Sequence, residues 1–303
     1  MNLTALAFRV VPRIPAPLAR ALFAVAADIA FVSRRKGVRQ LQANLARVVP
    51  GASPRRLRAL TKQGMRRYMR YFCEAFQLSR WSEAQIQRMV RPVSGDVAEA
   101  ALGAERQAVA ALAHMGNWDL AGAWATRHLA PVVTFAERLE HDEVFQRYLA
   151  MREALGMRII PVAPGVPAFR HMLQAVAGAG DTPWLAPLVA DRDLGRRGVE
   201  VTLFGEKALV GAGPAALALA TGRPLLPVSM HREGARYVLR FGPPVAFRDD
   251  LPRAEGIQAM TQEWVSVLEE QIREHPADWH MLQRVFIADL DPGKLMRVRG
   301  SST

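Results

Sequence analysis

Short apolar runs alternate with longer helical segments from about residue 107 onward, and this alternation limits the fold more than any other feature of the sequence. The runs are AVAALAH, APVVTFAE, MRIIPV, TPWLAPLVAD, VEVTLFG, PLLPVSM and RYVLRFGPPVAF. Strands that are apolar along their whole length are typical of parallel sheets covered by helices on both faces. We therefore expect an α/β fold in which a central, mostly parallel sheet is flanked by helices.

The first 92 residues differ from the rest in both pattern and charge. They predict an N-terminal helical layer, with a turn and a helix start near Ser53 or Pro54 in PGASPRR. Residues 1–95 hold 18 Lys and Arg against three acidic residues, a net charge of +15, whereas the other 208 residues have a net charge of −3. Because no obvious linker separates the two parts, we expect one domain over residues 1–303, with the helical layer at 1–92 and an α/β core at 105–288.

This basic layer predicts a polyanionic partner, either nucleic acid or an anionic membrane surface. Its arginines alternate with aliphatic and aromatic residues at helical spacing, as in MRRYMRYFCEAF, which favours amphipathic helices on a membrane over nucleic-acid binding. The alternative is that the helices pack on the core and their arginines face water, and the two interpretations are compatible. We predict a peripheral protein on the cytoplasmic face of the cell membrane, with no nucleic-acid partner.

The sequence predicts neither a secretory signal nor a membrane-spanning helix. The best candidate, residues 16–33, contains Arg20 and Asp28, and each charge costs a few kcal/mol at bilayer depth. Cys73 is the only cysteine, so an intrachain disulfide is impossible, which fits a cytosolic environment. Its apolar neighbours in YFCEAF predict that Cys73 lies in the core.

The most informative polar motif is HMGNWD, which directly follows the apolar run 108–113. If that run is a buried strand, His114 lies at its carboxyl end, where open α/β sheets bind their ligands. Asn117 then caps the next helix, and Asp119 lies in its first turn. The turn can bring His114 and Asp119 together, so that the carboxylate fixes the imidazole tautomer and the other ring nitrogen acts as a general base. The alternative is a hydrogen-bonded histidine at a strand end, beside an aspartate that only stabilises a helix N-terminus.

A second polar cluster lies in ADRDLGRRGVEV, where Arg192, Arg197 and Glu200 surround a glycine turn. Glu200 begins an alternating strand, and it could supply a second carboxylate for His114 or bind substrate hydroxyls. The alternative is a solvated hairpin tip, which is what most charged loops are.

Other chemistries have weaker support in the sequence. GAGPAALALATG contains a relaxed dinucleotide-binding pattern at Gly211, Gly213 and Ala216, but a proline interrupts it and it lies far from the first strand-helix-strand unit, so a nicotinamide oxidoreductase is a distant alternative. A phosphate-binding lysine loop, a G-x-S-x-G elbow and an HExxH zinc motif are missing. No third ligand stands near His114 at a recognisable spacing, so we expect neither a metal nor a cofactor.

HMGNWD resembles the H-x4-D/E motif of the lipid A late acyltransferase superfamily, whose members move fatty acyl chains from a thioester to a lipid-linked hydroxyl. Further blocks match in the same order, namely FAERLEHDEVFQRYLAMREALGMRIIPV, ADRDLGRRGVEVTLFGEKALVGAGPAALALATGRPLLPV and HPADWHMLQRVF. GVRQLQANLARV fits the superfamily's N-terminal helices. Together with the glutamate in RGVEV, these blocks are most similar to the actinobacterial phosphatidylinositol mannoside acyltransferases.

The resemblance implies transfer of a fatty acyl chain, commonly palmitoyl, from acyl-CoA to a mannose hydroxyl of a phosphatidylinositol mannoside. In that interpretation His114 is the general base, Asp119 orients it, Glu200 shares this work or binds mannose, and no covalent acyl-enzyme forms. The candidate substrate-binding residues are Asn117, Arg138, Arg192 and Arg197, with surface ion pairs as the alternative for the arginines. The open alternatives are an acyltransferase for another glycolipid or another thioester, and a peripheral membrane or nucleic-acid binding protein without chemistry.

A long acyl chain also requires an apolar tunnel. Burial contributes about 0.8 kcal/mol per methylene, so the depth of that tunnel should select the chain length. The alanine-rich helices could leave room for it, but the sequence does not identify the residues that line it.

Overall fold

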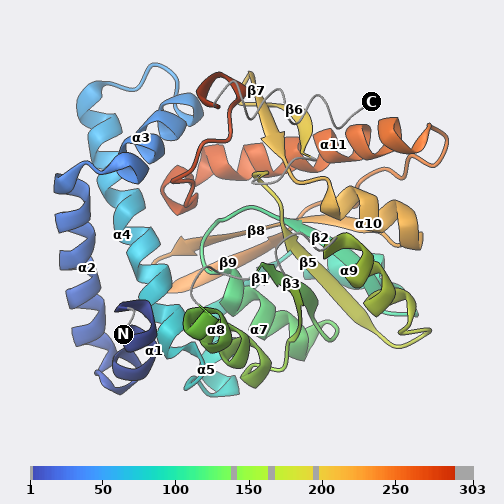
Figure 1. The fold of residues 1–303 in the computed structure, drawn as a ribbon, viewed down its shortest axis with the longest axis horizontal. Helices are drawn as coiled ribbons and strands as arrows, with labels where there is room; N and C mark the ends of the chain where they lie inside the picture. The colour runs from blue at the N-terminus through green and yellow to red at the C-terminus, as the bar shows by residue number, and fades with distance from the viewer. Residues whose placement is uncertain (1–2, 138–141, 163–167, 194–197, 291–303) are drawn as a thin grey trace.

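The structure is a computed structural model that describes residues 3–137, 142–162, 168–193 and 198–290 (Figure 1). A central sheet has helices on both of its faces, and a layer of N-terminal helices closes one end of it (Figure 1). The expected α/β fold with a mostly parallel central sheet is confirmed.

The main sheet has five strands in the order β1-β9-β8-β2-β5. Within it β2 pairs in parallel with β5 and β8, β1 pairs in parallel with β9, and β8 and β9 form an antiparallel pair. β3 and β4 form a parallel pair beside β5, and β6 and β7 form a hairpin. The strands are β1 (Val90–Val93), β2 (Gln107–Leu112), β3 (Val133–Glu137), β4 (Arg158–Val162), β5 (Trp184–Val189), β6 (Val199–Leu203), β7 (Glu206–Val210), β8 (Leu225–Glu233) and β9 (Arg236–Phe241).

Alternate residues of the buried strands point to two separate cores, one on each face of the sheet. On β2, Val109 and Ala111 join the core beneath α10 and α11, while Ala108 and Ala110 join the core beneath α6 and α7. The helices are α1 (Leu3–Val10), α2 (Ala16–Ser33), α3 (Lys36–Val48), α4 (Pro54–Leu78), α5 (Glu83–Met89), α6 (Gly95–Leu102), α7 (Trp118–His128), α8 (Asp142–Ala154), α9 (Ala168–Ala177), α10 (Gly213–Thr221) and α11 (Arg253–Glu274).

The N-terminal layer is helical from α1 to α5, as its sequence predicts. Its α4 begins at Pro54, where the Ser53 side chain accepts from the amide of Arg56, so the predicted helix start is confirmed. Cys73 is fully buried on this helix, also as predicted. The prediction of helix up to residue 92 was wrong at its end, because Val90–Val93 pairs with the edge of β9 and this tertiary pairing overrides the local preference.

One face of α2 is apolar and exposed, and α2 lies at the outer edge of the molecule (Figure 1). We call this face the α2 stripe; its residues are Leu18, Leu22, Val25, Ile29 and Val32, which are 51% to 72% exposed. The spacing of four and three residues places all five side chains on one side of the helix. The opposite side packs on α4, where Arg66 binds the Asp28 carboxylate. Within the described residues, α2 is the helix that is long and apolar enough to cross a membrane by length and composition.

The core under α11 makes a testable contribution to stability. Trp264 of α11 is 1% exposed and packs in the core between this helix and the sheet. We expect Trp264→Ala to lower the free energy of unfolding by about 3–5 kcal/mol, because it removes a large buried side chain and leaves a cavity. Urea unfolding followed by circular dichroism measures this loss. Phe247→Ala is the matched control, since Phe247 is 39% exposed and its loss should change stability much less.

Candidate active site

His114 lies two residues beyond the last residue of β2, at the carboxyl end of a fully buried strand. The neighbouring parallel strand β5 ends at Val189, which pairs with Leu112 of β2. His114 and Asp191 each lie two residues beyond this last pair, one after β2 and one after β5, so they continue the same register. The parallel pairing of β2 and β5 therefore places these two side chains opposite each other, although 77 residues separate them in the sequence.

The carboxylate of Asp191 holds both the ring and the backbone of His114. The Nδ1 atom of His114 lies 2.5 Å from Oδ1, and the His114 amide donates to Oδ2 at 2.9 Å. The indole Nε1 of Trp279 donates to the same Oδ2 at 2.8 Å. Since a carboxylate only accepts, Nδ1 carries the proton, and Nε2 is left as the acceptor nitrogen. The side chain of His114 is 20% exposed, so Nε2 belongs to a ring that remains partly accessible.

Burial by itself would raise the pKa of Asp191. The adjacent imidazole of His114, together with the hydrogen bonds from His114 and Trp279, outweighs burial and lowers the pKa of Asp191 below its ordinary value. Asp191 is therefore ionised at neutral pH, and it can stabilise an imidazolium that forms on His114.

Asp119 is not the partner of His114, which corrects the expectation from the motif. It lies in the first turn of α7 as predicted, but its carboxylate accepts from Tyr71 Oη at 2.8 Å and from Arg152 Nε at 2.7 Å. Burial, with Asp119 as the second cause, raises the pKa of Tyr71 well above its usual range, so the phenol keeps its proton and donates it. Asp119 thus connects α7 to α4 and α8, because its position in the helix directs the carboxylate toward those helices.

Asn117 is the N-cap of α7, as predicted. Its Oδ1 accepts from the amide of Leu120 at 3.0 Å, and its Nδ2 donates to Glu74 at 3.3 Å. The side chain is fully buried. Both of its polar atoms are used inside the protein, so the structure gives Asn117 a structural contact in place of the predicted contact with substrate.

The other predicted residues lie elsewhere or outside the described residues. Glu200 lies on β6, 38% exposed, with its carboxylate 2.6 Å from Lys207 Nζ on β7; it is paired across the hairpin and not with His114. Arg192 directly follows Asp191 and is close enough to Tyr68 to oppose the rise in pKa that burial causes in that phenol. Arg138 and Arg197 lie outside the described residues.

The segment 275–280 supports the motif through its backbone. Gly116 donates its amide to the Asp278 carbonyl at 2.9 Å, and His280 donates its amide to the His114 carbonyl at 2.7 Å. His280 also donates from Nε2 to the Gly116 carbonyl at 3.0 Å. Gly116 has φ +64°, and a Cβ there would lie 2.3 Å from the Met230 carbonyl oxygen, so only glycine fits this close approach. The HPADWH block of the sequence therefore shapes the loop that carries His114.

An apolar cavity lies between α7 and the sheet. Ala110 and Leu112 of β2 form part of its floor, and small residues of α7, including Ala121 and Ala125, leave the space above them. The cavity is small, at about 30 Å³. Trp118 lines the cavity, and its ring centroid is 5.4 Å from the ring centroid of His114. Trp118 therefore adjoins both His114 and the apolar cavity.

The described residues contain no group of three or more His, Cys, Asp or Glu side chains that could hold a metal ion. The site contains the imidazole of His114, held by the carboxylate of Asp191, next to an apolar space. Such an arrangement can remove a proton from a hydroxyl while an apolar substrate lies beside it.

Known proteins similar to this chain were identified by sequence and by structure. A sequence model for bacterial lipid A biosynthesis acyltransferases matches residues 2–287. A phosphatidylinositol mannoside acyltransferase of Mycolicibacterium smegmatis is 36% identical over 294 residues, which cover 96% of this chain and 92% of the relative. One from Mycobacterium tuberculosis is 36% identical over 275 residues, covering 89% and 83%. The crystal structure of a 1-acyl-sn-glycerophosphate acyltransferase from Thermotoga maritima matches with a TM-score of 0.39 and 12% identity, covering 86% of this chain and 98% of that one.

The buried imidazole of His280 predicts a pH dependence of stability. Burial lowers its pKa to about 3, against the opposing hydrogen bond to Gly116, so the folded protein stays unprotonated there while the unfolded chain binds a proton below about pH 6.5. Stability from this group is therefore lost as pH falls from about 6.5 toward 3. We expect the unfolding free energy of the parent to fall with decreasing pH more steeply than that of His280→Gln, by about 1 kcal/mol per pH unit.

Urea unfolding at pH 6.5, 5.5 and 4.5 measures the two slopes. Burial raises the pKa of Asp278 to about 6. The contribution of Asp278 to the unfolding free energy therefore increases as the pH falls from about 6 to 4, opposite in sign to that of His280. That contribution is present in both proteins and cancels in the difference. Equal slopes for parent and variant would contradict the assignment of a neutral, buried His280.

Proposed function

The chain belongs to the bacterial lipid A biosynthesis acyltransferase family and is an acyltransferase, and from this premise we propose that it transfers a fatty acyl chain, palmitoyl in the simplest case, from acyl-CoA to a mannose hydroxyl of a phosphatidylinositol mannoside. The mannoside acceptor is taken from the names of relatives that are 36% identical to this chain over most of its length. Acyl transfer to a glycolipid is the common part of the family description and of those names.

The observation that carries this proposal is the contact between His114 and Asp191 beside an apolar cavity. A sugar hydroxyl is a weak nucleophile, whereas a thioester carbonyl is reactive and its thiolate leaves readily. The reaction therefore needs one positioned base, which typically contributes about 10²- to 10⁴-fold to the rate. His114 meets this need, because Asp191 fixes the tautomer that leaves Nε2 unprotonated.

In the proposed reaction, Nε2 of His114 accepts the hydroxyl proton as the sugar oxygen attacks the thioester carbonyl carbon. The carbonyl π electrons move to oxygen, and the resulting tetrahedral oxyanion then collapses and breaks the carbon–sulfur bond. The CoA thiolate leaves with that electron pair and takes the proton from His114. Asp191 stabilises the transient imidazolium and stays ionised throughout.

The start of α7 supplies candidates to stabilise the oxyanion. The amides of His114, Met115 and Gly116 already donate to protein acceptors. The first amides of α7 have no acceptor within their own helix, and the helix dipole gives them a partial positive charge. We assign the oxyanion to the amides of Trp118 and Asp119, which follow the base in the chain.

The acyl chain is proposed to occupy the cavity beneath α7. Its lining residues are all apolar, and they include Trp118 next to the base. The cavity is small, so a long chain would enter by displacing the side chains that line it. At about 0.8 kcal/mol per buried methylene, a chain of palmitoyl length has enough binding energy to do so.

The membrane supplies the acceptor, and α2 is proposed to lie on its surface. The α2 stripe occupies one side of α2, and the other side of the helix packs on α4. Asp28 on that packed side is paired with Arg66 and Lys62 of α4, so α2 would have to leave these partners in order to span a bilayer. We therefore propose a peripheral protein that inserts the stripe between anionic headgroups on the cytoplasmic face, where acyl-CoA is available, and that has no nucleic-acid partner.

Three variants test the catalytic proposal. We expect His114→Ala to lower kcat by about 10²- to 10⁴-fold, because it removes the base, and Asp191→Asn to lower it by at least about 10²-fold, because the amide no longer fixes the tautomer. Glu200→Gln is the matched control and should retain activity close to that of the parent, since Glu200 is paired with Lys207. The assay follows radiolabelled palmitoyl transfer from palmitoyl-CoA to purified mannosylated phosphatidylinositol.

Equal labelling of lipid by the parent and His114→Ala would contradict the proposed role of His114 as the base and favour a non-catalytic membrane protein. A loss with Glu200→Gln as large as that with Asp191→Asn would overturn the choice of carboxylate. Repeating the assay with a different purified glycolipid separates the mannoside acceptor from the broader alternative.

A filled cavity should change the preference for acyl length. Ala121 lines the cavity on α7, and Ala121→Leu removes space needed by the end of a long chain. We expect kcat/KM for palmitoyl-CoA to fall at least about tenfold relative to octanoyl-CoA, because long chains lose buried methylenes and short ones do not. Ala123→Leu, on the same helix but outside the cavity lining, controls for overpacking and should affect both donors equally. A constant ratio in Ala121→Leu would exclude this cavity as the acyl site.

A further inference from the structure

The segment 275–280 contacts both members of the candidate catalytic pair, and Trp279 makes the contact with the acid. The backbone amide of His280 donates to the His114 carbonyl at 2.7 Å. The indole Nε1 of Trp279 donates to Asp191 Oδ2 at 2.8 Å. Because the two donors belong to neighbouring residues, one short piece of chain holds the backbone of the base and the side chain of the acid.

The indole of Trp279 is fixed by packing and by its neighbour in the chain. Its side chain is fully buried, and its ring centroid lies 5.7 Å from that of Phe204 in an edge-to-face arrangement. The preceding residue, Asp278, accepts from the Gly116 amide through its carbonyl at 2.9 Å. A turn of the indole away from Asp191 would therefore require the core around it to repack.

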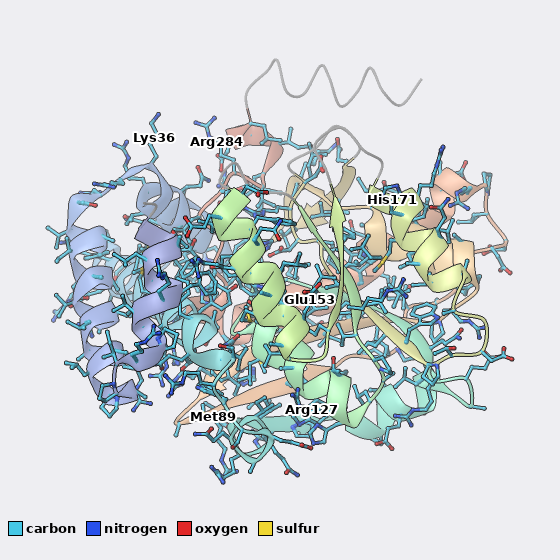
Figure 2. All side chains as sticks on the ribbon, turned by 60° about the horizontal axis from the view of Figure 1, so that its bottom comes forward. Lys36, Met89, Arg127, Glu153, His171 and Arg284 are labelled. Atoms are coloured by element: carbon cyan, nitrogen blue, oxygen red, sulfur yellow. The ribbon has the colours of Figure 1, made fainter. Side chains whose placement is uncertain are left out.

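After this segment the chain is anchored to the N-terminal layer. Asn44 of α3 is fully buried, and its Nδ2 donates to the carbonyls of Met281 and Gln283 at 2.8 and 2.9 Å. Figure 2 labels the next residue, Arg284, at the same edge of the molecule as Lys36, with which α3 begins. The segment is therefore held from two sides, by the loop that follows β2 and by α3.

The hydrogen bond from Trp279 determines how the Asp191 carboxylate is turned. Oδ2 accepts from the indole and from the His114 amide, so Oδ1 is left facing Nδ1 of His114 at 2.5 Å. Without the indole, a single backbone amide would hold Oδ2, and the carboxylate would be free to rotate about its Cβ–Cγ bond. Rotation would weaken the contact that fixes the imidazole tautomer.

An indole is suited to this position because it donates a hydrogen bond without carrying a charge. Burial raises the pKa of Asp191, while the charge of His114 and the hydrogen bonds from His114 and Trp279 lower it below its ordinary value. A lysine or arginine in this place would also favour the ionised carboxylate, but its positive charge would oppose an imidazolium on His114. The indole N–H only donates, so it leaves the negative charge of Asp191 available to the imidazole.

We propose that Trp279 is a positioning residue for acyl transfer, which directs the Asp191 carboxylate at His114 and so keeps Nε2 of the imidazole free to accept the hydroxyl proton. This role rests on the proposed function, in which His114 is the base. It adds to the catalytic pair a third side chain that touches no substrate. Because Trp279 acts through Asp191, its loss should change the imidazole tautomer and the rate of transfer, and it should leave substrate binding unchanged.

The tautomer of His114 tests the proposal without a catalytic assay. Long-range proton–nitrogen NMR spectra of protein labelled with ¹⁵N-histidine distinguish protonated from unprotonated ring nitrogens, and His114→Ala identifies the His114 signals by their loss. At about pH 8, well above the ordinary pKa of histidine, we expect the Nδ1–H tautomer alone in the parent and a mixture of both tautomers in Trp279→Phe. Trp264→Phe is the matched control and should keep the parent tautomer, since Trp264 lies in the same core and its Nε1 has no hydrogen-bond partner among the described residues.

A second replacement at position 279 removes the donor and keeps the shape of the side chain. 3-Benzothienylalanine has a sulfur atom in place of the indole N–H and is nearly the same size as tryptophan, so it leaves the core filled. We expect it to give the same mixture of tautomers as Trp279→Phe. Unchanged circular dichroism and melting temperature establish that the protein is folded.

The kinetic test uses the radiolabelled palmitoyl transfer. We expect Trp279→Phe to lower kcat about ten- to a hundredfold, the range for a hydrogen bond to a charged group, and to leave KM for both substrates close to that of the parent. When Asp191→Asn is already present, Trp279→Phe should cause no further loss, because the carboxylate on which it acts is gone. A purely structural role would instead lower the rate by the same factor in both backgrounds.

Three results would overturn the proposal. The first is an Nδ1–H tautomer that remains the sole form in both replacements of Trp279, and the second is an equal change of tautomer in Trp264→Phe. The third is an equal loss of kcat from Trp279→Phe with and without Asp191→Asn. If the parent transfers no acyl chain, the proposed function fails, whereas the tautomer still decides whether Trp279 directs Asp191 at His114.

Discussion

The buried carboxylate of Asp191 is the interaction on which the site depends, because three separate parts of the chain meet on it. It joins the end of β2 through His114, the end of β5 through its own backbone, and the C-terminal segment through Trp279. A carboxylate removed from water is tolerated only when its charge and its lone pairs are satisfied. The strand register and the docking of segment 275–280 must therefore both be correct for the charge to be stable, and the same requirement orients the imidazole of His114.

Two other buried carboxylates connect the N-terminal helices to this centre. Asp119 of α7 accepts from Tyr71 of α4 and from Arg152 of α8, while Glu74 of α4 accepts from Asn117 at the start of α7. Because α2 packs on α4, a continuous set of contacts leads from the exposed apolar face of α2 to the helix that follows His114. The acid of the H-x4-D motif thus holds helices together around His114, while the imidazole itself is held by Asp191, which follows another strand.

Local sequence signals predicted much of the fold and part of the site. The apolar runs of β2, β5 and β8 predicted a buried sheet, and the capping residues Ser53 and Asn117 predicted helix starts, since each signal acts over a few residues. His114 was identified for the same reason, as a polar residue at the end of a buried strand. Asp191 stood in the quoted ADRD stretch at the end of another apolar run, and aligning the carboxyl ends of the two strands would have found it.

The sequence by itself determined that the chain builds a covered, mostly parallel sheet, that a histidine stands at the end of one strand, and that a basic helical layer precedes the sheet. The tertiary structure alone decided which carboxylate reaches that histidine, because Asp119, five residues away, is turned aside by the start of α7, while Asp191, 77 residues away, is brought in by strand register. It also placed Glu200 on a hairpin with Lys207 and opened the cavity under α7. Hydrophobic periodicity and helix capping depend on residues close together in the sequence, so they can be predicted from it. Contacts between strand ends form only when the strands have assembled into the sheet.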